Sequence, residues 1–133
     1  MLDTNVLISA LVFGGKVRHI LHLIFNFGLT VYISEYVDNE FKRILNEKWS
    51  DKVEKIYSKY ITMNFIFCPS TDKILGNLRD EKDIPVLSDA IFHNVDVLLT
   101  GDKDFLESDV ETPLIISPTE FLEYMIKIFE EVK

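Results

Sequence analysis

Short apolar runs rich in β-branched residues alternate with amphipathic segments of helical period along most of this chain, and this alternation restricts its fold more than any other feature. Apolar residues recur at helical spacing in Val17–Phe27, whereas Leu29–Ile33 and Val95–Thr100 are typical of buried strands. Strands that alternate with helices favour a parallel sheet with helices on both faces. We therefore expect an α/β fold with three layers, α/β/α, around a central, mainly parallel sheet.

Residues that begin or end helices set further boundaries. Gly28 is suited to end the first long helix. Ser34 is a typical N-cap for a helix over 35–46, and Ser50 for one that continues to residue 60. The remaining expected elements are a first strand within Met1–Val6 that ends near Asp3, a strand over Asn64–Cys68, a helix over Asp83–His93, a short strand over Leu114–Ile116 and a last helix opened by Pro118.

Size and composition are those of one domain. The chain has 133 residues, of which 47% are hydrophobic, enough for a single core over residues 1–133. No apolar run is long enough to cross a bilayer, and the first residues lack a signal-peptide pattern, so we expect a cytoplasmic protein without a membrane partner. Cys68 is the only cysteine, which excludes a disulfide framework and a cysteine-rich zinc site.

Several acids fall where expected parallel strands end or the next helices begin. Ligands bind beyond the carboxyl ends of the strands in such sheets, and carboxylates that converge there repel one another and raise their pKa values. Oxygen ligands suit Mg²⁺ or Mn²⁺ rather than zinc, and two such ions activate water on a phosphodiester. The net charge of −8 argues against a nucleic-acid protein that relies on bulk positive charge, unless cations fill such a pocket. These acids are Asp3, Glu40, Asp83 and Asp102.

Four segments in order along the chain resemble the PIN-domain family. Specifically, they resemble its VapC-like ribonucleases, the toxin components of toxin–antitoxin systems. A lone DTN sequence would be a weak signal, but four segments in family order and spacing are a strong one. The segments are LDTNVLIS at Leu2–Ser9, ISEYVDNEF at Ile33–Phe41, DEKDIPVLSDAI at Asp80–Ile91 and DVLLTGDKDF at Asp96–Phe105.

The resemblance implies a site and an activity. Asp3, Glu40 and Asp83 would bind Mg²⁺ or Mn²⁺, with Asp102 as the fourth acid and Asp104 as the residue that takes or shares this role. The implied reaction is hydrolysis of RNA by in-line attack of water, without a covalent enzyme intermediate. An antitoxin protein is the implied partner, and the apolar stripe of the last helix suits either its own domain or a homodimer. The residues expected to orient carboxylates or water are Thr4, Asn5, Ser34 and Thr100.

Two other functions remain open. The chain could be a catalytically weak or inactive PIN module that binds RNA or a protein partner, because its first strand starts at Met1 and is short. It could also be a phosphatase with Asp3 as nucleophile, although Asn5 occupies the position where that chemistry needs a second Asp. Asp89 follows Asp83 by six residues, about 240° around a helix, so we expect it to face away from the metal pocket.

Overall fold

Parallel pairing joins distant parts of the chain into one sheet. The computed structural model describes residues 1–132. Strand β1 (Val31–Ser34) pairs in parallel with β2 (Phe65–Cys68), and β3 (Val97–Leu99) pairs in parallel with β4 (Leu114–Ile116). The segment Met1–Asp3 lies between these pairs, because the Leu2 amide donates to the Tyr32 carbonyl at 3.3 Å and the Asp3 amide donates to the Leu99 carbonyl at 3.1 Å. The order across the sheet is therefore β2, β1, Met1–Asp3, β3 and β4.

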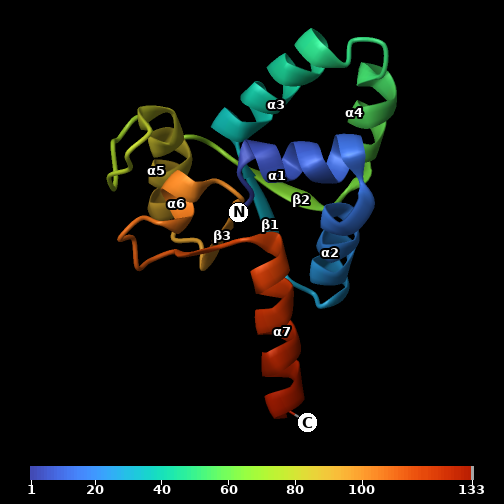
Figure 1. The fold of residues 1–133 in the computed structure, drawn as a ribbon. Coiled ribbons are helices and arrows are strands. Elements are labelled where there is room, and N and C mark those ends of the chain that lie inside the picture. The colour runs from blue at the N-terminus through green and yellow to red at the C-terminus, as the bar shows by residue number, and fades with distance from the viewer. Residues whose placement is uncertain (133) are drawn as a thin grey trace.

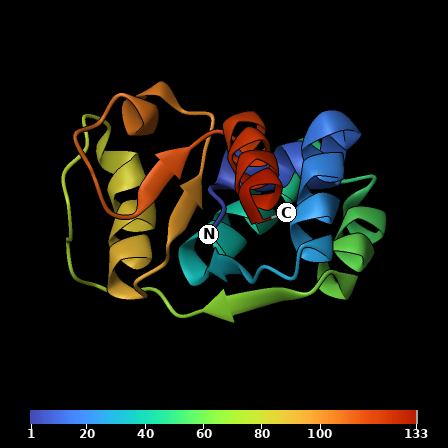
Figure 2. The ribbon, with the colours of Figure 1, turned by 90° about the horizontal axis from the view of Figure 1, so that it is seen from below.

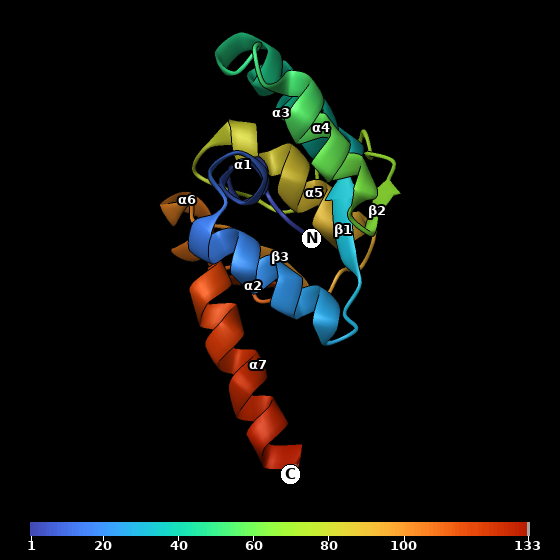
Figure 3. The same ribbon diagram turned by 90° about the vertical axis from the view of Figure 1, so that its right-hand side faces the viewer.

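Helices surround this sheet and confirm the expected three-layer α/β/α fold. Figures 1 and 2 place α5 and α6 on one side of the N-terminal segment and α2 and α4 on the other, while α7 extends away from the body of the molecule (Figure 3). No single helix within residues 1–132 is long and apolar enough to cross a membrane. The helical elements are α1 (Thr4–Ile8), the π-helix η1 (Ser9–Phe13), α2 (Gly15–Asn26), α3 (Glu35–Lys48), α4 (Val53–Thr62), the 3-10 turn η2 (Glu81–Asp83), α5 (Ile84–Phe92), α6 (Lys103–Leu106) and α7 (Pro118–Val132).

The N-terminal extended segment ends at Asp3 because this residue begins a helix. Asp3 has an extended backbone, and its Oδ1 accepts a hydrogen bond from the Val6 amide at 2.9 Å. This bond satisfies one of the amides that a helix N-terminus leaves unpaired. The expected end of the first strand near Asp3 is therefore confirmed.

Other caps show which local signals are reliable. Ser34 Oγ accepts from the Val37 amide at 3.2 Å and begins α3, as expected. Gly28 follows α2 with a φ of 79°, a conformation that favours glycine. The proposed Ser50 cap is wrong, because α4 begins later, after Lys52, and has no side-chain cap. Helix α6 was not expected, and it begins after Asp102, whose side chain accepts from the Asp104 amide at 2.8 Å.

Three aromatic side chains, which we call the aromatic cluster, fill the core between α3, α4 and β2. Phe41, Tyr60 and Phe65 are buried, with ring centroids 4.8 Å apart for the first pair and 5.7 Å apart for the second. The Tyr60 hydroxyl donates to the Asp38 carboxylate at 2.8 Å. The cluster therefore buries large apolar area while its one polar atom keeps a partner, as a stable core requires.

Candidate active site at the carboxyl ends of the strands

A buried threonine ties together two acids that leave neighbouring strands. Asp3 ends the N-terminal segment, and Thr100 directly follows β3. The Thr100 hydroxyl donates to Asp3 Oδ2 and accepts from the Asp102 amide at 3.0 Å. Thr100 and Asp3 are both buried. The Thr100 side chain therefore contacts both the Asp3 carboxylate and the Asp102 backbone.

Beside this pair, η2 and α6 bring three more acids together. One carboxylate oxygen from each of Asp80, Asp83 and Asp104 lies within 4.8 Å of those of the other two. Asp83 Oδ2 is buried and has no hydrogen-bond partner within residues 1–132. Buried polar atoms in proteins nearly always have partners, and an unsatisfied one is costly. A cation would give this oxygen its missing partner, and the all-oxygen donor set fits Mg²⁺ or Mn²⁺.

Asp80 is the acid that the sequence did not single out. Its carboxylate accepts from the Lys82 amide at 3.0 Å and so caps η2. In a 3-10 turn, side chains three residues apart lie above one another, which brings Asp80 beside Asp83. The signal was present as an acid three residues before Asp83 and shortly before Pro85, a residue common in the first turn of a helix.

Burial and mutual repulsion raise the pKa values of the central carboxyls. Burial raises the pKa of Asp3 to about 6, against the lowering effect of hydrogen bonds from Thr100 and Val6. Burial also raises the pKa of Asp83 to about 7. Charge repulsion adds to each increase, from Asp102 and Glu40 at Asp3, and from Asp102, Asp80, Asp3 and Asp104 at Asp83. Six acids are therefore linked by charge repulsion at Asp3 and Asp83, and we call them the carboxylate site: Asp3, Glu40, Asp80, Asp83, Asp102 and Asp104.

Helix α3 adds Glu40 from the other side of the carboxylate site. The Tyr36 hydroxyl donates to the Lys82 carbonyl at 3.3 Å, which holds α3 beside η2. Glu40 is partly exposed, and one of its carboxylate oxygens lies 4.0 Å from an Arg43 nitrogen. Because Ser34 fixes where α3 begins, it also sets the position of Glu40 along the helix.

The comparisons with known proteins agree with this geometry. A family model described as a PIN domain matches residues 1–104. The chain belongs to the PIN-domain family. PIN domains are in general metal-dependent nucleases that act on RNA, and the matched part contains all six acids of the carboxylate site. The match ends before β4 and α7. A comparison with curated proteins gives no match.

The remaining polar residues expected at this PIN-domain site differ in their contacts. Thr4 Oγ1 is buried without a hydrogen-bond partner within residues 1–132. Asn5 is exposed on α1, and within the same residues its side chain makes no hydrogen bond that would orient a carboxylate. Asp89 accepts from the Ser70 hydroxyl at 2.6 Å and from the Thr71 amide at 2.7 Å. As expected, Asp89 lies away from the carboxylate site.

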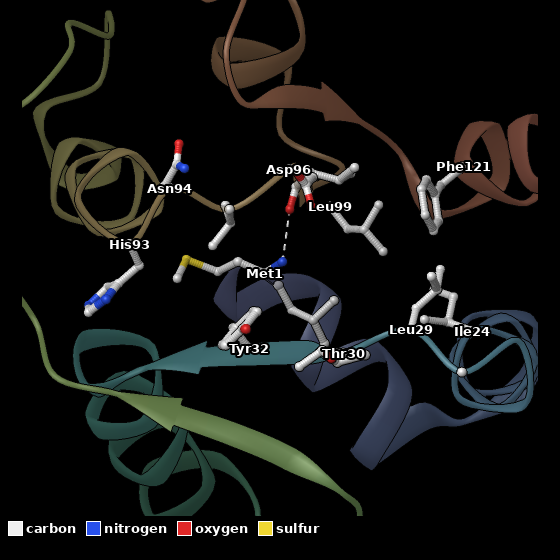
Figure 4. A pocket seen from close by; sticks show the side chains of 15 residues that line it. Met1, Ile24, Leu29, Thr30, Tyr32, His93, Asn94, Asp96, Leu99 and Phe121 are labelled. Carbon is white, nitrogen blue, oxygen red and sulfur yellow. Dashed lines mark hydrogen bonds between the residues drawn. The ribbon is translucent and has the colours of Figure 1, made fainter.

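A cavity of about 420 Å³ opens at the opposite, amino ends of the strands (Figure 4). Thr30 and Asp96, which precede β1 and β3, help to line it, and it contains none of the six acids. The N-terminal ammonium of Met1 lies at this end and donates to the Val97 carbonyl at 2.8 Å. Burial lowers the pKa of this ammonium to about 5. This cavity of the PIN domain therefore lies at the end of the sheet opposite its carboxylates.

Proposed function

We propose that this PIN domain is a Mg²⁺- or Mn²⁺-dependent endoribonuclease that hydrolyses phosphodiester bonds in RNA. The observation that carries the proposal is the Asp83 carboxylate. Its Oδ2 is buried with no hydrogen-bond partner within residues 1–132, and one of its oxygens lies within 4.8 Å of oxygens of Asp80 and Asp104. Mutually repelling carboxylates become stable together when hard cations neutralise them. The residues that would hold the ions are Asp3, Glu40, Asp83 and Asp102, together with Asp80 and Asp104.

Each residue of the site has a task that follows from its contacts. Thr100 holds the carboxylate of Asp3 and the backbone of Asp102, so the two acids keep a fixed separation. Asp102 in turn begins α6 and thereby places Asp104 in its first turn. The bound ions would activate the attacking water and stabilise the leaving oxygen. The task of the protein is to hold its carboxylates in place before RNA arrives.

The contacts of Asp3 disfavour the phosphatase alternative. Both of its carboxylate oxygens accept hydrogen bonds, from the Val6 amide and the Thr100 hydroxyl, and its side chain is buried. Each oxygen keeps a lone pair for a cation, but a buried carboxylate does not offer the open approach to a phosphorus atom that a nucleophile needs. Asp3 is instead arranged as a positioned anion, which suits hydrolysis without a covalent enzyme intermediate.

The biological role that we propose is that of the toxin in a toxin–antitoxin pair in the cytoplasm, with residues 1–133 acting as one domain. The net charge of −8 suits an antitoxin with a basic segment. Exposed apolar side chains on α7, including Ile126 and Ile128, suit a homodimer contact. The competing role is a weak or inactive PIN module that binds RNA or a protein without cutting.

Cleavage of labelled RNA by the purified protein tests the activity. We expect cleavage with Mg²⁺ or Mn²⁺, and a loss of at least about 100-fold in Asp3→Asn. Asp96→Asn is the matched control, because it removes an exposed acid at the amino end of β3, and it should cut as the wild type does. A folded, antitoxin-free protein that cuts neither single-stranded nor structured RNA with either metal would contradict the proposal and favour the inactive module.

A further inference from the structure

Arg79 lies at the edge of the carboxylate site, directly before Asp80. Its Nε lies 3.5 Å from Asp104 Oδ1, and its Nη2 lies 3.5 Å from Glu107 Oε2. Its side chain is 72% exposed. The guanidinium borders an open cavity of about 440 Å³, which Asp104 and Glu107 also line. Arg79 is thus a cation at the solvent-exposed edge of the acids of η2 and α6.

The contacts of Arg79 are looser than those of the other two arginines in the chain. Arg18 donates to the Ala10 carbonyl at 2.7 Å and to the Leu11 carbonyl at 3.0 Å, so it is bound within the fold. One Arg43 nitrogen lies 3.2 Å from each carboxylate oxygen of Glu47. Strong ion pairs have N···O distances of about 2.7–2.9 Å, and exposed pairs contribute little to stability. Arg79 is therefore the arginine that an incoming anion displaces most easily from its present partners.

An RNA strand approaching this site meets strong negative charge. The protein carries a net charge of −8, and the six acids converge where the strand must lie. Within residues 1–132, the cations in ion-pair distance of the carboxylate site are Arg43, at Glu40, and Arg79, at Asp104. A guanidinium also matches the geometry of a phosphate group, with two parallel hydrogen bonds.

We propose that Arg79 binds a backbone phosphate of the RNA next to the bond that is cut, exchanging Asp104 and Glu107 for the phosphate as its partners. This inference rests on the proposed ribonuclease function. It assigns Arg79 to substrate binding rather than to the integrity of the fold, because its side chain is exposed and, within residues 1–132, its ion pairs are with side chains alone. Loss of Glu107 should make Arg79 more available to RNA.

The test compares Arg79→Ala and Arg79→Lys with Lys55→Ala, which removes the same charge from the exposed face of α4. Three measurements are made on each variant. The first gives kcat and KM with Mn²⁺ on a fluorescent single-stranded oligoribonucleotide. The second gives the equilibrium Kd of the same oligoribonucleotide with Ca²⁺ over a range of salt concentrations, and the third gives the affinity for Mn²⁺ without RNA. Each phosphate contact on a single strand contributes about 0.7 to the slope of log K against log salt.

We expect Arg79→Ala to raise KM about tenfold or more with a smaller change in kcat, and to lower the salt slope by about 0.7 relative to Lys55→Ala. Arg79→Lys should restore part of the affinity, and Glu107→Gln should bind RNA at least as tightly as the wild type. Equal KM values and slopes for Arg79→Ala and Lys55→Ala would overturn the inference. So would weaker Mn²⁺ binding by Arg79→Ala with unchanged RNA affinity, because Arg79 would then only position Asp104. If the wild type itself cuts no RNA, the proposed function fails and this inference with it.

Discussion

The aromatic cluster and the carboxylate site share helix α3 but follow opposite physical rules. Phe41 enters the aromatic cluster, where apolar area is buried and the one hydroxyl is paired. Its neighbour Glu40 joins the carboxylate site, where pKa values are raised and one buried oxygen has no partner within residues 1–132. The first region stabilises the fold, whereas the second costs stability. Several buried groups that each lower stability and lie close together indicate a functional site.

Asp83→Asn should have the largest effect, because it should lower RNA cleavage while it raises stability. Removing this carboxylate should lower RNA cleavage by about 1000-fold, since it takes a ligand oxygen from the centre of the site. It should also raise the thermal unfolding temperature without added metal, because burial and four neighbouring acids disfavour its charge. Thermal unfolding with and without Mn²⁺, beside cleavage assays, measures both effects. Asp51→Asn, at an exposed acid before α4, is the control, and a lower unfolding temperature for Asp83→Asn alone would contradict this account.

Neighbouring substitutions on α3 should have opposite consequences. Phe41→Ala should lower the free energy of unfolding by about 3–5 kcal/mol, because it leaves a cavity in a fully buried position. Glu40→Gln should change the free energy of unfolding little and lower cleavage strongly. Urea unfolding and cleavage per folded molecule measure the two quantities. If both variants lose stability to the same degree, the division between the two regions along α3 is wrong.

The stability of the protein without added metal should depend on pH through Asp3. Its pKa is about 3.8 in the unfolded chain and about 6 in the folded one, so the folded protein binds more protons between these values. The free energy of unfolding should therefore fall as pH rises from 4 to 7, by up to about 3 kcal/mol from this group.

The Met1 ammonium should have the opposite effect, so that it makes the free energy of unfolding rise with pH. Its pKa is lowered to about 5 in the folded protein, so the unfolded chain binds more protons between pH 5 and 8. Urea unfolding of wild type and Asp3→Asn at pH 4, 5.5 and 7 isolates the Asp3 contribution as the difference between the two proteins. If the free energy of unfolding depends on pH in the same way in both proteins, the pKa of Asp3 is not raised on folding, and the prediction is wrong.

Two hydroxyl deletions give the smallest expected effects. Thr100→Val should lower cleavage by about 10-fold, because it frees the carboxylate of Asp3 and leaves the Asp102 amide without its acceptor. Tyr60→Phe should lower the free energy of unfolding by about 1 kcal/mol and leave cleavage unchanged, since its partner Asp38 lies outside the carboxylate site. Cleavage kinetics and urea unfolding of both variants compare the two regions. Loss of cleavage in Tyr60→Phe would show that the aromatic cluster and the carboxylate site are not independent.

The order of strands, helices and acids could be predicted because it depends on local pattern and on residues near each other in sequence. Asp3 and Asp102 follow β-strand patterns, and the parallel sheet brings these strand ends together. The prediction of the Ser34 cap was correct for the same reason, because the Ser34 hydroxyl and the Val37 amide that it accepts from lie within one helical turn.

What the sequence could not provide depends on local geometry and long-range contact. Asp80 joins the site through a short 3-10 turn, which the sequence indicates weakly by an acid three residues before Asp83 and shortly before Pro85. Ser50 has the chemistry of a cap, but the chain continues through a turn and α4 begins after Lys52. The division of labour between Asp102, which caps α6, and Asp104, which lies with Asp80 and Asp83, is visible only once α6 is in place.

The most direct test of the central claim is anomalous scattering from Mn²⁺ soaked into crystals of the protein. We predict a Mn²⁺ peak within bonding distance of Asp83 Oδ2 and of at least one oxygen from Asp80 or Asp104, and no such peak in Asp83→Asn crystals. Crystals without a peak at the carboxylate site, or with Mn²⁺ bound equally in wild type and Asp83→Asn, would contradict the claim that this cluster is built to hold a metal.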